Sequence, residues 1–262
     1  MKSKRALISG VTGQDGAYLA KLLLSKGYKV FGTFRRTSTP NFWRLQYADV
    51  YSKINLIPAD LTDMGSLINS IKISDPDEVY NMAAMSFVRT AFEQPVGNSH
   101  STGTAVTRFL ESIKSINPNV KFYQASSSEM FGNSNTQIQN FSPASPYAAA
   151  KLYAHWITKI YQEAYDMFAV SGILFNHESP IRGLEFVTRK ITNAAAQIKL
   201  GLKKDISIGN LQSKRDWGYA PEYMEAIYLM MQQDKPETYV ISTGETYSVE
   251  ELAKVSFEIL NL

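Results

Sequence analysis

The sequence predicts an α/β fold, in which a doubly wound parallel sheet is followed by a smaller C-terminal lobe. Short apolar runs alternate with longer helical patterns through the first two-thirds of the chain, an order that is typical of parallel sheets covered by helices. The runs are nearly continuous in Val, Ile and Leu, as expected when both faces of a sheet are covered. Beyond about residue 176, Gly and Pro interrupt the pattern and loops predominate.

The expected elements follow one another as strand and helix. Strands are expected at residues 6–9, 29–34, 54–57, 78–82, 120–125 and 169–174. Helices are expected near residues 18–25, 64–73, 102–116 and 147–165. No internal repeat is present.

A glycine-rich turn joins the first strand to the first helix. Gly10, Gly13 and Gly16 lie at this junction. Glycines allow the backbone to turn sharply and to approach a pyrophosphate, whose charge is favoured by the helix N-terminus. The spacing GxxGxxG differs from the GxGxxG of the simple dinucleotide fingerprint, so an ordinary glycine turn is the alternative. Its place between a strand and a helix favours a Rossmann-like dinucleotide site.

The segment after the second strand bears on the choice of dinucleotide. A site for NAD usually has an acidic residue here, which binds the ribose 2′-hydroxyl. This chain has Arg35 and Arg36, followed by Thr37 and Ser38. Guanidinium and hydroxyl groups suit a 2′-phosphate, which favours NADP over NAD. A solvated basic turn is the alternative.

Asp60 and Leu61 follow the third expected strand. They are candidates for lining an adenine site. Asp60 could equally cap the helix that starts near Thr62.

The candidate acid/base groups lie farther along the chain. Tyr147 and Lys151 are four residues apart in an Ala-rich segment, which places them on one face of a helix. An ammonium near a phenol favours the phenolate, so we expect the pKa of Tyr147 to lie below about 10. Ser127 and Glu129 follow the fifth strand, where a hydroxyl and a carboxylate could act as hydrogen-bond donor and base. A serine-rich loop is the alternative.

Composition excludes several classes of function. The net charge of +3 and the absence of a long basic run argue against a nucleic-acid partner. The chain has no cysteine, and its three histidines have no metal-ligand spacing, so no metal is expected. The apolar segments are too short for a membrane span. The basic start of the chain is followed by a short strand and glycines, whereas a signal peptide would have a sustained apolar region there. These features predict a cytoplasmic protein with no membrane partner.

Together, the glycine turn, Ser127, Tyr147 and Lys151 resemble the extended short-chain dehydrogenase/reductase superfamily. More narrowly, the chain resembles the family of GDP-mannose 4,6-dehydratases, and the resemblance covers essentially the whole chain. It rests on residues 12–16, 35–36, 123–132, 151–157, 173–180, 186–190 and 214–218. The last three blocks are far more specific than the dinucleotide fold, which hosts many chemistries.

The resemblance implies a set of site residues. Ser127, Glu129 and Tyr147 would be catalytic, and Lys151 would orient the nicotinamide ribose; Ser127 stands where the family usually has Thr. The NADP contacts would fall on Gly10, Thr12, Gly13, Gln14, Asp15, Gly16, Arg35, Arg36, Asp60, Leu61, Ala83, Ala84, Ser86, Tyr147, Lys151, His177 and Arg182. The substrate contacts would fall on Ser86, Glu129, Asn176, Lys190 and Arg215.

The resemblance also implies a function. The chain would be a lyase that dehydrates GDP-mannose to GDP-4-keto-6-deoxy-mannose by internal hydride transfer through bound NADP. Residues 1–175 would form the dinucleotide-binding domain and residues 176–262 the substrate lobe, with some chain crossover between them. The lobe is expected to be incomplete, and a homodimer or homotetramer is expected. An NADP-dependent nucleotide-sugar reductase or epimerase, or a catalytically impaired nucleotide-binding protein, is the alternative.

Overall fold

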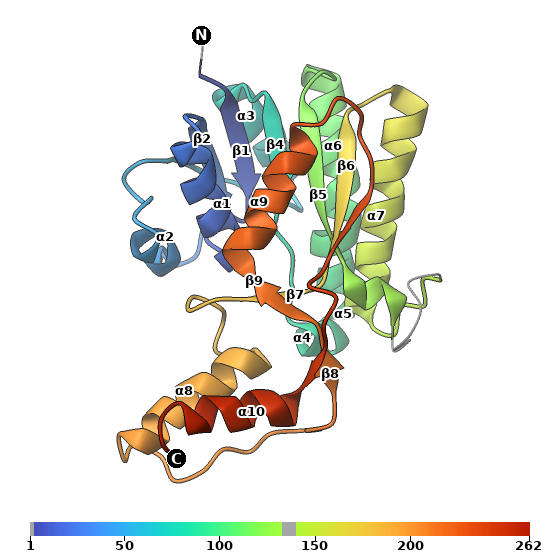
Figure 1. The fold of residues 1–262 in the computed structure, drawn as a ribbon. Coiled ribbons are helices and arrows are strands. Elements are labelled where there is room, and N and C mark those ends of the chain that lie inside the picture. The colour runs from blue at the N-terminus through green and yellow to red at the C-terminus, as the bar shows by residue number, and fades with distance from the viewer. Residues whose placement is uncertain (1–2, 133–139) are drawn as a thin grey trace.

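Seven parallel strands form the main sheet of the computed structural model, which describes residues 3–132 and 140–262. The strands are paired in the order β10-β6-β5-β4-β1-β2-β3, so the chain winds outward in both directions from β1 (Figure 1). Their bounds are β1 Arg5–Ser9, β2 Lys29–Phe34, β3 Asn55–Pro58, β4 Glu78–Asn81, β5 Lys121–Ser127, β6 Ala169–Leu174 and β10 Tyr239–Ile241. The predicted doubly wound parallel sheet is confirmed.

Helices cover both faces of this sheet. One face packs against α1, α2 and α9, and the other against α3, α6 and α7, each through its own apolar cluster. The bounds are α1 Gln14–Ser25, α2 Trp43–Tyr47, α3 Met64–Ser74, α4 Val88–Glu93, α5 Pro95–Asn98, α6 Ala105–Ile116, α7 Pro146–Tyr165 and α9 Ala220–Met231. Tyr80 and Tyr123 of the central strands β4 and β5 are fully buried, as expected for strands whose two faces are both covered by helices.

Two helices differ at their N-terminal ends from the sequence pattern: α1 begins earlier than expected, and α6 begins at Ala105, later than expected. Helix α1 starts at Gln14, four residues before the expected start at residue 18. Its N-cap is Gly13, which has no side chain to mark the start of the helix in the sequence. The helix expected from residue 102 is preceded by α5 and by a π-helical turn, η1 Ser99–Thr104. The short helices α2, α4 and α5 carry too few residues for a periodic signal.

The C-terminal region contains a second layer of small elements below the sheet (Figure 1). Helices α8 Val187–Lys199 and α10 Val249–Glu258 pack against each other. Two short ribbons accompany them, formed by β7 Asn176–Glu178 with β9 Trp217–Tyr219 and by β8 Lys214–Arg215 with β11 Tyr247–Ser248. A capping box between Ser248 and Glu251 fixes the start of α10.

The chain returns from this region to the main sheet. Helix α9 packs on α1, and β10 pairs with β6 as the outermost strand. Segments from residues 176–262 therefore lie in both layers, and the division at residue 175 stays a prediction. Among the residues that the structure describes, no helix is both long enough and apolar enough to cross a bilayer.

Candidate active site

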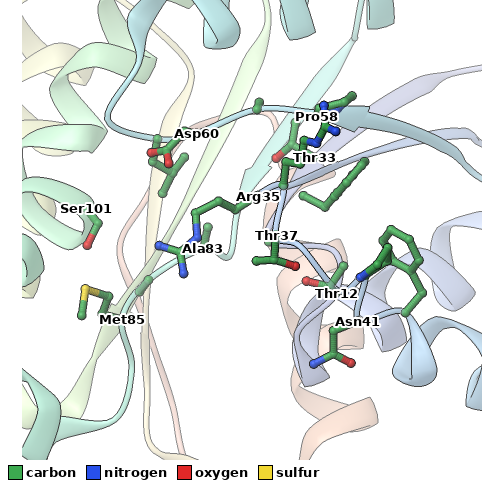
Figure 2. A pocket seen from close by; sticks show the side chains of 18 of the residues that line it. Thr12, Thr33, Arg35, Thr37, Asn41, Pro58, Asp60, Ala83, Met85 and Ser101 are labelled. Atoms are coloured by element: carbon green, nitrogen blue, oxygen red, sulfur yellow. The ribbon is translucent and has the colours of Figure 1, made fainter.

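Two adjoining cavities open at the carboxyl ends of the parallel strands, where doubly wound sheets bind ligands. The first has a volume of about 720 Å³ and is lined mainly by the segments that follow β2 and β3 (Figure 2). The second has a volume of about 700 Å³ and includes the ends of β5 and β6 and the start of α7. Gly10, Thr12, Ala83 and Ala84 line both cavities, so they form one continuous site.

The glycine turn is shaped for close approach by a ligand. Gly10 has a φ of +68°, and a Cβ there would lie 2.8 Å from the Cα of Ala83. A Cβ on Gly16 would lie 2.5 Å from the carbonyl oxygen of Gly10. The N-cap Gly13 offers no side chain to the first turn of α1, which leaves that turn open to an anion. This geometry fits the pyrophosphate of a dinucleotide.

Basic and acidic groups meet in the first cavity. Arg35 and Arg36 are exposed and line it, together with Thr37 and Ser38. Figure 2 shows the Arg35 side chain on the side of the cavity where Asp60 lies. Hydrogen bonds from the Thr62 hydroxyl and backbone lower the pKa of Asp60, and the charge of Arg35 adds to this effect.

Asp60 does not cap the following helix. Its Oδ1 accepts hydrogen bonds from the Thr62 N–H at 2.8 Å and the Thr62 hydroxyl at 2.7 Å. The N-cap of α3 is Asp63, whose Oδ1 accepts from the Gly65 N–H at 2.9 Å. The capping alternative for Asp60 is therefore wrong, because the helix begins at Met64 rather than near Thr62 and Asp63 supplies its cap.

Ser127 and Glu129 are held together at the end of β5. The Ser127 hydroxyl is the N-cap of a single 3₁₀ turn, η2 Ser128–Phe131, and accepts a hydrogen bond from the Glu129 N–H at 3.2 Å. Both residues line the second cavity. The serine run is thus a strand end with a cap rather than a loose loop.

Tyr147 and Lys151 lie on the first turns of α7, which Ser145 caps and Pro146 begins. Both side chains are buried and line the second cavity. The Lys151 Nζ lies 5.8 Å from the centre of the Tyr147 ring and donates a hydrogen bond to the Ala125 carbonyl at 2.6 Å. The predicted pairing of these two residues on one helix face is present.

The pKa expected for Tyr147 is wrong for the chain alone. Burial raises the pKa of Tyr147 to about 12, and the charge of Glu129 works in the same direction, against the lowering effect of the Ser127 hydroxyl. Burial also lowers the pKa of Lys151 to about 8. Burial therefore favours the protonated phenol, whereas positive charge near the ring favours the phenolate.

An ion pair joins the glycine turn to β7. The His177 Nδ1 donates to the Phe175 carbonyl at 2.7 Å, and its Nε2 lies 3.0 Å from the Asp15 Oδ2. Burial opposes charge on both groups, but each stabilises the other, so the pKa of His177 is raised and the pKa of Asp15 is held well below its usual value. His177 also stacks on the Tyr223 ring at 4.6 Å.

The remaining predicted residues also lie along the cavities. Leu61 lines the first cavity, and the second is lined by Gln14, Ser86, Asn176, Arg182, Lys190 and Arg215. Sequence reasoning missed Glu185, Phe186 and Ile208, which line the second cavity too. The Arg182 guanidinium lies over the Phe186 ring at 3.6 Å. Apolar lining residues carry no chemical signal in a sequence, which explains two of these omissions.

The described residues contain no cluster of His, Asp and Glu side chains that could hold a metal ion. A glycine turn at a helix N-terminus, beside a buried Tyr and Lys pair, defines a protein of the short-chain dehydrogenase/reductase type. The cavity extends from that turn to a hydroxyl and a carboxylate at the end of β5.

Comparison with known proteins narrows this class. The family model of GDP-mannose 4,6 dehydratase matches residues 7–262. GDP-mannose 4,6 dehydratase 2 of Arabidopsis thaliana is 50% identical, over 99% of this chain and 73% of its own length. The human GDP-mannose 4,6 dehydratase is 48% identical, over 96% of this chain and 71% of its own length. The chain belongs to the GDP-mannose 4,6-dehydratase family.

Solved structures agree on the fold. A dTDP-glucose 4,6-dehydratase from Streptomyces venezuelae, with NAD and TYD bound, superposes with a TM-score of 0.86 at 19% identity, covering 98% of this chain and 81% of the other. A UDP-N-acetylglucosamine 4-epimerase from Methanobrevibacter ruminantium gives a TM-score of 0.85 at 23% identity, covering 100% and 84%. At these identities the likeness supports the fold alone.

Proposed function

We propose that the chain is a lyase that dehydrates GDP-mannose to GDP-4-keto-6-deoxy-mannose. The family assignment supports the substrate. The observation that carries the reaction is the place of Glu129, which the Ser127 cap holds in the same cavity as Tyr147 and Lys151. A simple dehydrogenase needs only the Tyr and Lys pair, whereas elimination of water needs a base for the proton on C5.

The proposed cofactor is NADP. The residues that would hold it are the glycine turn at the pyrophosphate, Arg35 and Arg36 at the 2′-phosphate, and Lys151 at the nicotinamide ribose. The acidic residue that follows β2 in NAD sites is absent from this segment, where both guanidiniums are exposed to the cavity. The chemistry that bound NADP⁺ supplies is acceptance of a hydride from C4 of the hexose and its return to C6.

The protein residues move the protons. Tyr147 accepts the proton of the C4 hydroxyl, and Ser127 donates a hydrogen bond to the oxygen that becomes the ketone. The ketone acidifies the C5 proton, which Glu129 removes while water leaves from C6. Two protons leave the sugar, from O4 and from C5, and two are delivered, one with the departing water and one to C5. Tyr147 and Glu129 therefore end each turnover in their starting states.

Burial of Tyr147 sets a condition on this sequence. A phenol with a pKa of about 12 is almost entirely protonated at pH 7. Positive charge close to the ring stabilises the phenolate, and within the site Arg182 already acts in this direction. The residues placed to favour the phenolate are Ser127 and Arg182, and bound NADP⁺ would add positive charge near the ring.

The test is incubation of the purified protein with GDP-mannose and NADP⁺, followed by mass spectrometry. The expected product has lost one water, with no net formation of NADPH. In a parallel incubation with NADPH, net consumption of NADPH would instead assign a reductase. A change of configuration without loss of mass would assign an epimerase. Binding of GDP-mannose without any product would leave only the nucleotide-binding role.

The proposed oligomer is a homodimer formed through α7. Tyr153, Trp156 and Ile160 are spaced by three and four residues on this helix, and each is more than two-fifths exposed. The Tyr153 hydroxyl is hydrogen-bonded to Thr107 of α6 at 2.8 Å, so the apolar face extends toward α6. Light scattering should give twice the mass of one chain, and Trp156→Glu should shift it to the monomer. The predicted cytoplasmic location is tested separately, by fractionation of the source cells.

A further inference from the structure

A buried carboxylate lies at the point where the chain passes between the two small ribbons. Asp216 is only 4% exposed. Its Oδ1 accepts hydrogen bonds from the Thr243 N–H at 3.1 Å and the Thr243 hydroxyl at 2.9 Å. Its Oδ2 accepts from the Thr243 N–H at 3.0 Å and the Gly244 N–H at 2.9 Å. Asp216, Thr243 and Gly244 are called the Asp216 clamp below.

The clamp joins two passages of the chain between the layers. Asp216 is the single residue between β8 and β9, and residues 242–246 connect β10 of the main sheet to β11. Figure 1 shows this connection descending toward α10 beside β9 and β8. Strand β11 pairs with β8 through Tyr247 with Arg215 and Ser248 with Lys214. The clamp adds a second connection between the same two segments, directly after Arg215.

The residue before the clamp faces the site. Arg215 lines the second cavity and is itself exposed. Among the described residues, the one protein group to which its guanidinium donates is the Lys214 carbonyl, at 2.8 Å. Among the described residues, no salt bridge includes Arg215. The backbone of Arg215 is paired with β11 and is followed directly by the buried Asp216, so these contacts decide from where its side chain reaches into the cavity.

We propose that Asp216 is a positioning residue for substrate, which acts by holding Arg215 where it meets the diphosphate of the sugar nucleotide. This inference rests on the proposed function. Burying a carboxylate is unfavourable unless it is fully hydrogen-bonded, and here three donor groups satisfy both of its oxygens. The three donor groups belong to Thr243 and Gly244, which are exposed. The carboxylate of Asp216 therefore fixes the segment of residues 242–246 relative to Arg215, and it does not contribute to packing of the core.

The distinguishing measurement is a split between KM and kcat. Asp216→Asn puts an NH₂ group where an oxygen accepts from backbone N–H groups, while keeping the size of the side chain. We expect the Kd and the KM of GDP-mannose to rise about tenfold, as for loss of a charge-assisted anchor. The kcat and the Kd of NADP should stay within about twofold, because no residue of the clamp lines either cavity.

A double-mutant cycle tests whether Asp216 acts through Arg215. If it does, Asp216→Asn should add little to the loss caused by Arg215→Met, because the anchored group is already absent. Full additivity of the two losses would overturn the inference. Thr243→Val, which removes one donor and keeps the backbone bonds, should give a smaller rise in KM, and Thr243→Ser should restore the wild-type value.

The control is Gln212→Ala, which removes the bond of Gln212 to Glu250 in the same region at the surface and should leave all constants unchanged. If wild type binds and converts GDP-mannose and Asp216→Asn, folded by circular dichroism, does the same with equal KM, the inference is overturned and the proposed function stands. If wild type itself neither binds nor converts GDP-mannose, the proposed function fails and takes the inference with it.

Discussion

Replacement of Arg35 and Arg36 by Ala should change the choice of cofactor. A hydrogen bond to a charged group contributes about 1.5–3 kcal/mol. Both guanidiniums are exposed, and solvent reduces an exposed ionic contact to about 1 kcal/mol. The double variant should therefore lose about 2 kcal/mol toward NADP, which is about a 30-fold rise in Kd. Its Kd for NAD should change by less than about twofold, because NAD has no 2′-phosphate.

Calorimetric titration with NADP and NAD at two salt concentrations measures both effects. Salt screens exposed charges, so the preference for NADP should weaken in wild type at high salt and be insensitive to salt in the double variant. Arg89→Ala is the control, since Arg89 is an exposed arginine on α4 that pairs with Glu93 at 3.4 Å. Equal affinity of wild type for NADP and NAD, or equal weakening of both in the double variant, would refute the reasoning.

Three further predictions concern the site. Glu129→Gln should lower the rate of dehydration by about 10²–10⁴-fold with NADP affinity unchanged, because it removes the proton acceptor alone. Mass spectrometry of the products measures this rate, and a wild-type rate would remove Glu129 from the mechanism. Gly16→Ala should lower the melting temperature and the NADP affinity because its Cβ meets the Gly10 carbonyl at 2.5 Å, whereas Gly97→Ala, with no atom within 4 Å, should do neither. The Asp15–His177 pair should stabilise the fold most between their ordinary pKa values, 3.8 and 6.5. This stabilisation is lost as pH falls through the depressed pKa of Asp15 or rises through the raised pKa of His177. In urea denaturation, the midpoint of His177→Gln should therefore decline less than that of wild type as the pH is raised above 6.5.

The sheet could be predicted from the sequence because short apolar runs alternate with longer helical patterns in the first two-thirds of the chain. Strands β1 to β6 lie within two residues of the expected ranges. Strand β10 was not expected, since three residues, Tyr239–Ile241, at an edge leave no run to detect. Its pairing with β6 is a long-range contact that local pattern does not encode.

The site could be predicted as a set of residues, and its electrostatics could not. Each predicted site residue lines one of the two cavities. The motifs could be recognised because each directly follows a predicted strand or begins a predicted helix, at the edge of the sheet where ligands bind. The pKa of Tyr147 depends on how deeply the ring is covered, which tertiary packing decides. The ion pair of Asp15 with His177 joins residues 162 positions apart, so only the folded chain brings them together.

The late return of the chain to the main sheet has a consequence during synthesis. Chains grow from the N-terminus, and domains fold as they emerge. Until residue 241 has been made, β6 lacks the partner that β10 provides, and this exposed strand edge carries unpaired backbone groups. Pairing of β10 with β6 closes that edge, so the exposed edge is a feature of the growing chain and not of the folded protein.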